Sequence, residues 1–510
     1  ILIIDYGSQY TQLIARRIRE FEVFCLVYPY NKITKKILDK IKPSGFILSG
    51  GPKSVLDKDS PKLNKYILRM NKPILAICYG MQLLTKNLKG KVGRSKFREY
   101  GHTIINIKKN SLIFNGISKS KIKVWMSHGD NIHKVPKLFS ITSLSNNKIV
   151  SSIESVKKKI YCLQFHPEVY HTDFGSKIIK NFIFNIVKVK YKFKIQKFIE
   201  NKIIELKILI KDKKIICGLS GGVDSTVTAY LLSKAVNKNL YCIFVDNGLL
   251  RKNESEEVSK IFTKKFGNNF IKIEASNIFL KNLKNISDPE KKRKIIGKTF
   301  IQVFDKVAKK ISNVNFLGQG TLYPDVIESI PFFGGPTAKI KSHHNVGGLP
   351  KKMKLKVVEP LRELFKDEVR NVGKKLKINK DLLLRHPFPG PGIAIRIPGV
   401  IDKKKISILQ NADHIFIEYL KEKKLYNKIW QAFVVLLPVK SVGVMGDERT
   451  YNYSVSLRAI TSVDGMTADF YMFTNNQFKE ISSRIINNVK GINRVLYDFT
   501  SKPPGTIEWE

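Results

Sequence analysis

A cysteine stands where the chain could present a nucleophile. Cys78 follows the apolar run 73–77 in the pattern Ala-Ile-Cys-Tyr-Gly and precedes a helix-forming segment. Small residues two before and two after a nucleophile permit the tight strand-to-helix turn that lifts its side chain clear of a sheet. The helix N-terminus behind Cys78 favours the thiolate. A buried cysteine that packs as a small apolar residue is nevertheless the commoner case.

A histidine and a glutamate could activate this cysteine. His166 and Glu168 follow the strand-like run 159–165, and residues two apart in extended chain face the same side. Glu168 can therefore orient the ring of His166, which can serve Cys78 as general base. Each signal alone is weak, but ends of parallel strands are where α/β sites form.

A third segment could stabilise developing negative charge. Ser49-Gly50-Gly51-Pro52 again follows an apolar run directly. Glycines at such a turn allow backbone N–H groups to point at an oxyanion. We expect the N–H groups of Gly51 and Tyr79 to form this oxyanion hole.

A second loop has the composition of a phosphate cradle. It lies between the strand-like run IICGL and a helical run, where glycines allow close backbone approach, hydroxyls donate to phosphate oxygens and the helix N-terminus adds its dipole. Because the loop lacks the Gly-Lys pair of a Walker motif, we expect it to bind the pyrophosphate of ATP in another way. Its residues are Ser220, Gly221, Gly222, Val223, Asp224, Ser225 and Thr226.

Other short matches carry less weight. Gly297-Lys298-Thr299 mimics the end of a Walker motif, but position 292 is Lys, so we expect a helix there. Gly318-Gln319-Gly320 is expected to be a turn that places Thr321 and Asp325 near the nucleotide. Val245 to Gly248, at a strand end, would suit adenosine contacts or form a plain turn.

A glycine-rich stretch is expected to form a mobile lid. It runs from Gly334 to Gly348, and Lys341 within it could reach phosphate. The adjacent His343 and His344 do not predict a metal site, because neighbouring residues rarely ligate one ion in a regular element. No metal-ligating residue is assigned.

The elements that must position these residues are strands alternating with helices. That alternation, over residues 1–187 and again over 188–385, predicts two parallel-sheet α/β domains. The run HPFPGPG (386–392) cannot be helix or central strand and marks a boundary. Residues 386–510 are expected to form a smaller α+β domain.

Composition excludes several classes of protein. The chain has 510 residues with 43% hydrophobic content, so a wholly disordered or fibrous protein is excluded. Its longest apolar run, 432–437, is too short to span a bilayer, and its start does not resemble a signal peptide. Five cysteines without a CxxC pair favour a reducing compartment, so we expect a cytoplasmic protein without membrane contact.

The strong positive charge invites a nucleic-acid interpretation, which we do not favour. The net charge is +49, but the excess is mostly lysine spread along the chain with abundant Ile and Asn, as codon bias would produce. A dedicated nucleic-acid surface favours clustered arginine. We therefore expect no specific nucleic-acid partner.

Residues 1–187 resemble a class I glutamine amidotransferase domain. The resemblance rests on YGSQYTQLIARRIRE (6–20), SGGP, CYGMQ (78–82), WMSHGD (125–130) and QFHPEV (164–169). It implies that Cys78, His166 and Glu168 hydrolyse the amide of glutamine through a thioester and release ammonia. Ala76 stands where that family usually has Gly. The loop SGGVDST in turn resembles that of ATP pyrophosphatases, which leave an adenylated substrate.

The combination resembles the glutamine-hydrolysing GMP synthetase family over essentially the whole chain. Further matching segments are 288–301, 340–350, 385–392, 439–451 and 501–510. The resemblance implies that XMP is adenylated by ATP with Mg²⁺ and then aminated to GMP, and that the C-terminal domain forms a homodimer. By position it also implies a set of XMP contacts: Arg293, Gln431, Lys502, Ile507 and Glu508.

Two alternatives remain at this point. Other enzymes with the same loop, such as NAD synthetase or a tRNA-modifying ATP pyrophosphatase, would not account for the amidotransferase segments or the terminus PPGTIEWE. A nonenzymatic nucleic-acid or scaffold protein with decayed sites would not keep Cys78, His166, Glu168 and SGGVDS intact.

Overall fold

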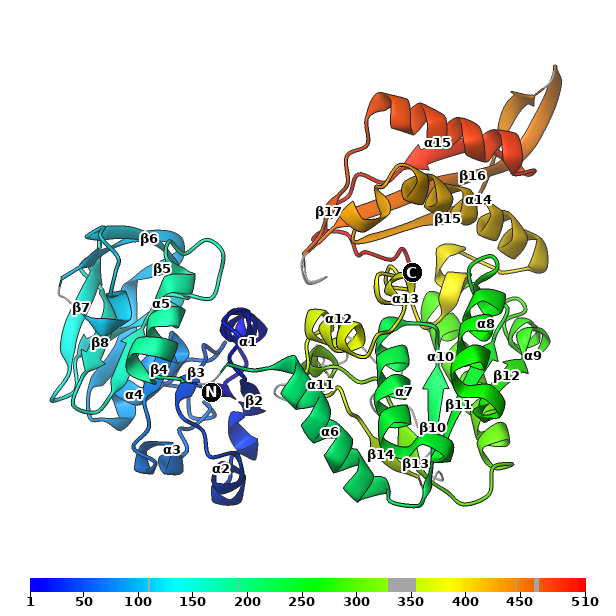
Figure 1. Ribbon diagram of the computed structural model, residues 1–510. Helices are drawn as coiled ribbons and strands as arrows, with labels where there is room; N and C mark the ends of the chain where they lie inside the picture. Colours follow the sequence, from blue (N-terminus) through cyan, green and yellow to red (C-terminus); the bar gives the residue numbers. More distant parts are fainter. Residues whose placement is uncertain (109–110, 191, 329–354, 446, 463–466) are drawn as a thin grey trace. The chain divides into compact units, whose positions relative to one another are not determined.

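The computed structural model describes the chain except for residues 109–110, 191, 329–354, 446 and 463–466 (Figure 1). The chain divides into two compact units, one over Ile1–Lys194 and one that begins at Ile195 and extends to Glu510. Within the described ranges, no helix is long and apolar enough to cross a membrane.

The first unit is built on one twisted sheet. In the described part of this unit the sheet has nine strands in the order β2-β1-β3-β4-β9-β8-β7-β5-β6. The strands are β1 (Leu2–Asp5), β2 (Leu26–Pro29), β3 (Phe46–Leu48), β4 (Ile74–Ile77), β5 (Lys91–Ile107), β6 (Lys121–Lys134), β7 (Ser140–Ser145), β8 (Val150–Ser155) and β9 (Ile160–Leu163). The helices are α1 (Thr11–Glu20), α2 (Lys35–Ile41), α3 (Lys65–Arg69), α4 (Tyr79–Asn87) and α5 (Gly175–Asn181).

Only part of this sheet is parallel. Strands β2, β1, β3, β4 and β9 pair in parallel. The apolar runs of β1, β3, β4 and β9 are buried, whereas the edge strand β2 is partly exposed. Strands β5 to β8 pair antiparallel and extend the same sheet. Strand β6 alternates buried and more exposed side chains along most of its length, which is typical of a sheet with one face in water.

The second unit begins with a parallel sheet. Its described strands have the order β12-β11-β10-β13-β14, and every pair is parallel. They are β10 (Lys214–Leu219), β11 (Leu240–Asp246), β12 (Phe270–Glu274), β13 (Val314–Gly318) and β14 (Lys356–Val358). The helices here are α6 (Ile195–Ile210), α7 (Val223–Val236), α8 (Glu254–Phe266), α9 (Ser276–Asn282), α10 (Pro289–Ala308), α11 (Tyr323–Glu328), α12 (Lys366–Lys375) and α13 (Lys380–Leu383).

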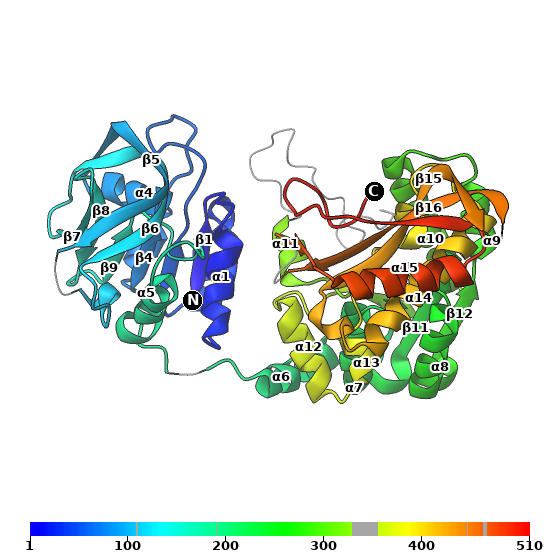
Figure 2. The same cartoon turned by 90° about the horizontal axis from the view of Figure 1, so that it is seen from above.

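A smaller α+β part completes the second unit. Strands β15 (Gln431–Met445) and β16 (Glu448–Thr461) form a long antiparallel hairpin. Strand β17 (Asp469–Phe470) pairs antiparallel and β18 (Ile492–Tyr497) parallel with β16. Helices α14 (Lys403–Glu422) and α15 (Asn475–Asn488) lie against this sheet, as Figure 2 shows. The fold therefore confirms the predicted class of two parallel-sheet α/β parts with a small C-terminal α+β part.

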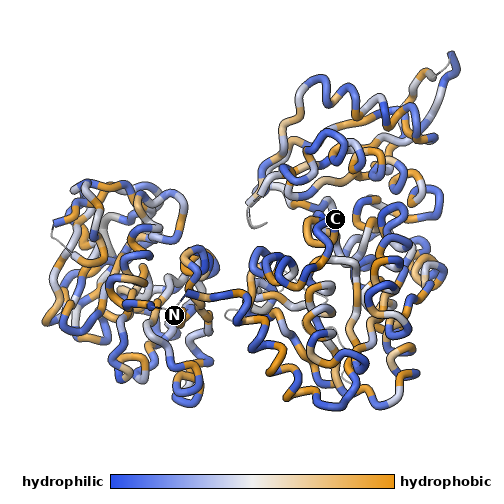
Figure 3. The backbone as a smooth tube through the Cα atoms, in the orientation of Figure 1, coloured by the Kyte–Doolittle hydropathy of each residue, from blue (hydrophilic) through white to orange (hydrophobic). Residues whose placement is uncertain are grey.

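One apolar core joins the parallel sheet to the C-terminal part of the second unit. Its buried members include Ile216 of β10, Ile393 from the segment after HPFPGPG, Phe416 of α14 and Val434 of β15. The division of this unit at residue 386 stays a prediction. Apolar and hydrophilic residues alternate along α6 (Figure 3), and Phe198, Leu206 and Ile210 are buried, so α6 is an amphipathic helix.

Candidate active sites

Cys78 stands at the junction of β4 and α4. Its backbone has φ +49° and ψ −107°, a conformation that residues other than glycine rarely adopt. The turn is tight, because a Cβ atom on Gly80 would lie 2.6 Å from the carbonyl oxygen of Leu48. Ala76 is fully buried in β4, and the Cys78 thiol is 5% exposed. The turn at Cys78 has the form that the sequence predicts.

His166 and Glu168 follow β9, the parallel neighbour of β4. The His166 Nδ1 and Glu168 Oε1 atoms are 2.7 Å apart, and both side chains are buried. A side-chain hydrogen bond also joins the ring to Cys78. Burial opposes the charged ring, but the Glu168 carboxylate and the Cys78 hydrogen bond raise the pKa of His166 well above its ordinary value. Cys78 thus lies beside a histidine ring whose charged form is favoured.

Neighbouring strands and helices hold the two residues after β9 in place. The backbone N–H of His166 donates to the carbonyl of Trp125 (3.0 Å), and the Thr172 hydroxyl donates to the carbonyl of His166 (2.7 Å). Arg17 of α1 donates from Nε to the carbonyl of Glu168 (3.1 Å). The ring can therefore turn little, as a positioned base requires.

The Gly50-Gly51 turn lies against the same residues. A Cβ on Gly50 would stand 3.0 Å from His166 Cε1, and one on Gly51 would stand 2.9 Å from the Tyr6 carbonyl oxygen. Tyr79 is the first residue of α4. Within the described residues, the backbone N–H groups of Gly51 and Tyr79 donate to no other protein group. Both are free to bind a developing oxyanion.

The predicted phosphate loop connects β10 to α7. Gly221 has φ +76°, and Gly222 is the N-cap of α7. The Ser220 and Ser225 hydroxyls are 3.1 Å apart, and the Thr226 hydroxyl donates to the Gly222 carbonyl (2.7 Å). Val223 and Thr226 are buried, whereas Ser220 is exposed. The loop thus presents hydroxyls and N–H groups at a helix N-terminus, where a phosphate is favoured.

Asp224 has a lysine partner that sequence reasoning missed. Lys366 Nζ of α12 lies 3.2 Å from Asp224 Oδ2, while the buried Oδ1 has no partner within the described residues. A Cβ on Gly320 would lie 2.9 Å from the Asp224 carbonyl carbon, so the turn after β13 packs against the loop. The orphan carboxylate oxygen suits a hard divalent cation such as Mg²⁺, which takes few protein ligands beside phosphate.

The predicted nucleotide contacts gather around the C-terminal tail. Glu508 accepts from Gln431 Nε2 at 2.6 Å and from Arg396 through both Nε (3.1 Å) and Nη2 (2.9 Å). Arg293 of α10 donates to the carbonyl of Glu510, and Lys292 Nζ pairs with the Glu510 carboxylate (2.5 Å). The structure therefore brings Gln431 and Glu508 into contact, and it anchors the tail on the helix that carries Arg293.

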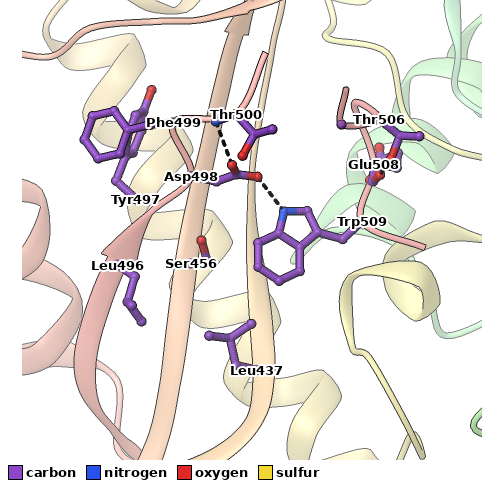
Figure 4. Close-up of a pocket in the computed structure, with 11 residues that line it drawn as sticks. Leu437, Ser456, Leu496, Tyr497, Asp498, Phe499, Thr500, Thr506, Glu508 and Trp509 are labelled. Carbon is purple, nitrogen blue, oxygen red and sulfur yellow. Dashed lines mark hydrogen bonds between the residues drawn. The ribbon is translucent and has the colours of Figure 1, made fainter. Parts of the chain in front are cut away.

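Lys502 and Ile507 belong to the same tail. Lys502 exchanges two backbone hydrogen bonds with Ala468, and Ile507 is half-buried. A pocket of about 500 Å³ lies beside the tail, lined by residues that include Asp498, Thr506, Glu508 and Trp509. The Trp509 indole points to Asp498 and donates to its carboxylate at 2.9 Å (Figure 4).

Arg396 is the functional residue in this region that sequence reasoning missed. It is fully buried, and its guanidinium lies 4.2 Å from the Phe433 ring centroid and 5.1 Å from that of Phe388. The signal was present: an arginine interrupts the apolar run GIAIRI (392–397), and a charge in such a run is rarely buried without a partner.

The remaining sequence predictions have mixed outcomes. Gly297-Lys298-Thr299 lies inside α10, as expected. The Asp325 carboxylate accepts from the N–H of Leu322, just before α11, and the buried Thr321 donates to Glu359. Their place near the nucleotide stays a prediction. The predicted lid, with Lys341, His343 and His344, lies outside the described residues.

Three segments of the chain match models of known protein families. Residues 2–186 match the family described as glutamine amidotransferase class-I, residues 192–299 match NAD synthase, and residues 418–509 match the GMP synthase C terminal domain.

Relatives match the chain over its whole length. A GMP synthase (glutamine-hydrolysing) of Brachyspira hyodysenteriae is 52% identical over 510 residues, covering 100% of this chain and 99% of the relative. A Thermotoga maritima protein of the same description is 52% identical and covers 100% of both chains. A third, from Bradyrhizobium diazoefficiens, is 51% identical and covers 100% of this chain and 93% of the relative. With identity of this level along every segment, the chain belongs to the glutamine-hydrolysing GMP synthase family.

Proposed function

We propose that this chain converts XMP to GMP with ATP and glutamine, and that the residues gathered above carry out the two half-reactions. The observation that supports this most directly is the pairing of two sites in one chain. One has a buried His166–Glu168 pair at 2.7 Å beside Cys78, and the other has a glycine-rich loop at the start of α7. An ammonia source and an ATP-dependent activator together make an amide or amine from a carbonyl.

In the first half-reaction, the Cys78 thiolate attacks the side-chain carbonyl of glutamine. The N–H groups of Gly51 and Tyr79 stabilise the oxyanion. The His166 imidazolium gives its proton to the departing nitrogen, so ammonia leaves and a thioester remains. His166 then removes a proton from water, which attacks the thioester and regenerates the thiol with release of glutamate. Glu168 keeps the ring oriented throughout and stabilises its charged form in the steps where His166 carries the proton.

In the second half-reaction, ATP lies with its β- and γ-phosphates in the loop Ser220–Thr226. The C2 oxygen of XMP attacks the α-phosphorus, pyrophosphate leaves, and the adenylated nucleotide is formed. Ammonia then displaces AMP at C2 to give GMP. Asp224 would hold Mg²⁺ through its orphan oxygen; the ion supplies charge neutralisation of the polyphosphate when bound. Lys366, at 3.2 Å from Asp224, would then also face phosphate.

XMP is bound by residues of α10, β15 and the tail. Arg293 and Lys502 would meet the 5′-phosphate, because cationic donors bind phosphate well. Glu508 accepts hydrogen bonds from the nucleotide, with Gln431 and Ile507 beside it. Support comes from the contact of Gln431 with Glu508 and from the docking of the tail on α10.

The assembly and location are part of the same proposal. The chain forms a homodimer through its C-terminal part, where Val444 and Tyr451 of the β15–β16 hairpin are 74% and 65% exposed. It works in the cytoplasm, in keeping with five cysteines that are all unpaired. The domains are 1–187, 188–385 and 386–510.

The test is GMP formation from XMP, ATP and Mg²⁺ with either nitrogen donor. We expect Cys78→Ala to abolish the glutamine-driven reaction and to leave the ammonia-driven reaction within twofold of the unmodified protein. Asp224→Asn should impair both. If the unmodified protein forms no GMP with either donor, the proposal is wrong. If Cys78→Ala still uses glutamine, the assignment of the nucleophile is wrong.

A further inference from the structure

The first unit contains a second buried histidine–glutamate pair, close to the nucleophile and unused by the mechanism above. His128 of β6 and Glu99 of β5 lie opposite each other in the strand register, and they are 4% and 3% exposed. His128 Nε2 lies 3.2 Å from Glu99 Oε2. His128 belongs to the segment WMSHGD (125–130), to which the proposed chemistry assigns no role.

Both ring nitrogens of His128 face acceptors. Nδ1 lies 3.0 Å from the carbonyl oxygen of Asp130, which can only accept, and Nε2 faces the Glu99 carboxylate. A neutral imidazole has one N–H and could satisfy only one of them. The other oxygen of Glu99 accepts from Asn147 Nδ2 at 3.0 Å. Although burial opposes its ionisation, the hydrogen bonds from His128, Ser145 and Asn147 hold the pKa of Glu99 below its ordinary value. With Glu99 as a carboxylate, both ring nitrogens can donate to their acceptors only if the ring is an imidazolium.

Two backbone carbonyls near His128 contact helix α4 and the Cys78 thiol. The Asp130 carbonyl also accepts from Gln82 Nε2 of α4 at 3.0 Å, and the same amide nitrogen lies 3.2 Å from Gln164 Oε1. The Ser127 carbonyl oxygen lies 3.5 Å from Cys78 Sγ. One buried ring therefore connects β5, β6 and α4 at the edge of the nucleophile's surroundings.

We propose that His128, as an imidazolium paired with Glu99, is a positioning residue for glutamine hydrolysis that fixes the Ser127 and Asp130 carbonyls against Cys78 and α4. This inference rests on the proposed role of Cys78. A buried ion pair contributes uncertainly to stability, because its desolvation offsets much of its attraction. We expect the pair to act by holding neighbouring groups in position, because displacement of a reacting group by about 1 Å can cost about 10²-fold in rate.

The test compares three variants in glutamine-driven and ammonia-driven GMP formation. Glu99→Gln keeps the shape but removes the charge, and His128→Gln removes the second donor. His133→Gln is the matched control, because His133 lies on the same strand but is exposed. We expect kcat/KM for glutamine to fall roughly 10- to 100-fold in the first two and less than twofold in the control. Ammonia-driven turnover should stay within twofold in all three.

A second measurement does not depend on activity. In the unmodified full chain labelled with ¹⁵N-histidine, the His128 resonances, assigned by their loss in His128→Gln, should show two protonated ring nitrogens at pH 7. A neutral ring, or a Glu99→Gln protein that keeps glutamine kcat/KM within twofold, would overturn the inference. Cys78→Ala in the same assay tests the proposed function separately. If this variant still uses glutamine, the proposed function is wrong. If Cys78→Ala loses glutamine use but Glu99→Gln is unaffected, only the positioning role is contradicted.

Discussion

Glu168 makes the largest favourable contribution to the charged form of His166. Glu168 raises the pKa of the ring, so replacing it with Gln removes that attraction and the pKa of His166 falls. The imidazolium that must protonate the leaving nitrogen is then scarcer at pH 7. We expect Glu168→Gln to lower kcat/KM for glutamine by about 10²-fold or more. Ammonia-driven GMP formation should be unchanged, and its loss to the same extent would contradict a role confined to the first unit.

We expect Arg396 to act on the proposed XMP site through Glu508. Arg396→Met leaves the Glu508 carboxylate without its two-pronged partner, and Arg396→Lys keeps the charge but loses the planar fork. We expect both variants to raise the KM for XMP, by roughly 10- to 100-fold in Arg396→Met, measured as pyrophosphate release with ammonia as donor.

The matched control for Arg396 is an exposed pair of the same kind. Arg484 contacts Glu422 through both Nη1 (2.6 Å) and Nη2 (3.0 Å) at the surface. Surface ion pairs contribute little, so Arg484→Met should leave the KM for XMP unchanged. An equal effect of both substitutions would show that Arg396 acts only through general stability.

Local chemistry could be predicted from the sequence, but long-range pairing could not. The turn at Cys78 and the loop at Gly221 are set by a few adjacent residues, so pattern and spacing predict their form. Arg396 and Glu508 are separated by 112 positions, and nothing local in either segment specifies the other. The same holds for Lys366 and Asp224, which meet only because α12 packs beside α7.

Among elements, apolar runs predicted the parallel strands better than the antiparallel ones. β4 and β10 lie inside their sheets and are nearly fully buried, so each shows a continuous apolar run. β5 and β6 mix polar and apolar residues because one face meets water. Their pairing places Glu99 opposite His128, which no motif indicates.

His386 makes the junction between the two parts of the second unit sensitive to acid. Its ring stacks on Tyr426 at 3.8 Å, its Nδ1 accepts from the Ala432 N–H, and its Nε2 donates to the Tyr426 carbonyl. These bonds need the neutral ring, and burial lowers the pKa of His386 to about 4. The ordinary value is about 6.5, so between these values the unfolded chain binds the additional proton.

The free energy of unfolding should therefore fall as the pH drops from about 6.5 to 4, by about 3 kcal/mol in total from this residue. The measurement is urea unfolding of a Trp125→Phe background, in which Trp430 and Trp509 of the second unit supply the fluorescence. His386→Gln should be less stable at pH 7 but show a flatter dependence on pH. An unchanged slope in that variant would contradict the assignment.

At the scale of the whole molecule, the positive charge and the apolar surface have different consequences. A net charge of +49 distributed along the chain favours weak, salt-sensitive adhesion to polyanions and opposes close approach of two copies. A homodimer must therefore bury enough apolar area to overcome this repulsion. The β15–β16 hairpin offers such an area: Val442 is paired with Tyr451 in the register, and Val444 lies two residues along the same face. All three are exposed.

Placing a charge on this face should dissociate the dimer. We expect the unmodified protein to sediment at about twice its chain mass of 58.4 kDa, and the double variant Val444→Lys, Tyr451→Lys to sediment as a monomer. The control is Val156→Lys in the first unit, where the side chain is also exposed (60%); this variant should remain a dimer. Because the added charge lies on an exposed surface, the double variant should stay folded, which circular dichroism can check. If the unmodified protein sediments as a monomer, the proposed homodimer does not exist. If the double variant remains dimeric, the contact between copies lies elsewhere.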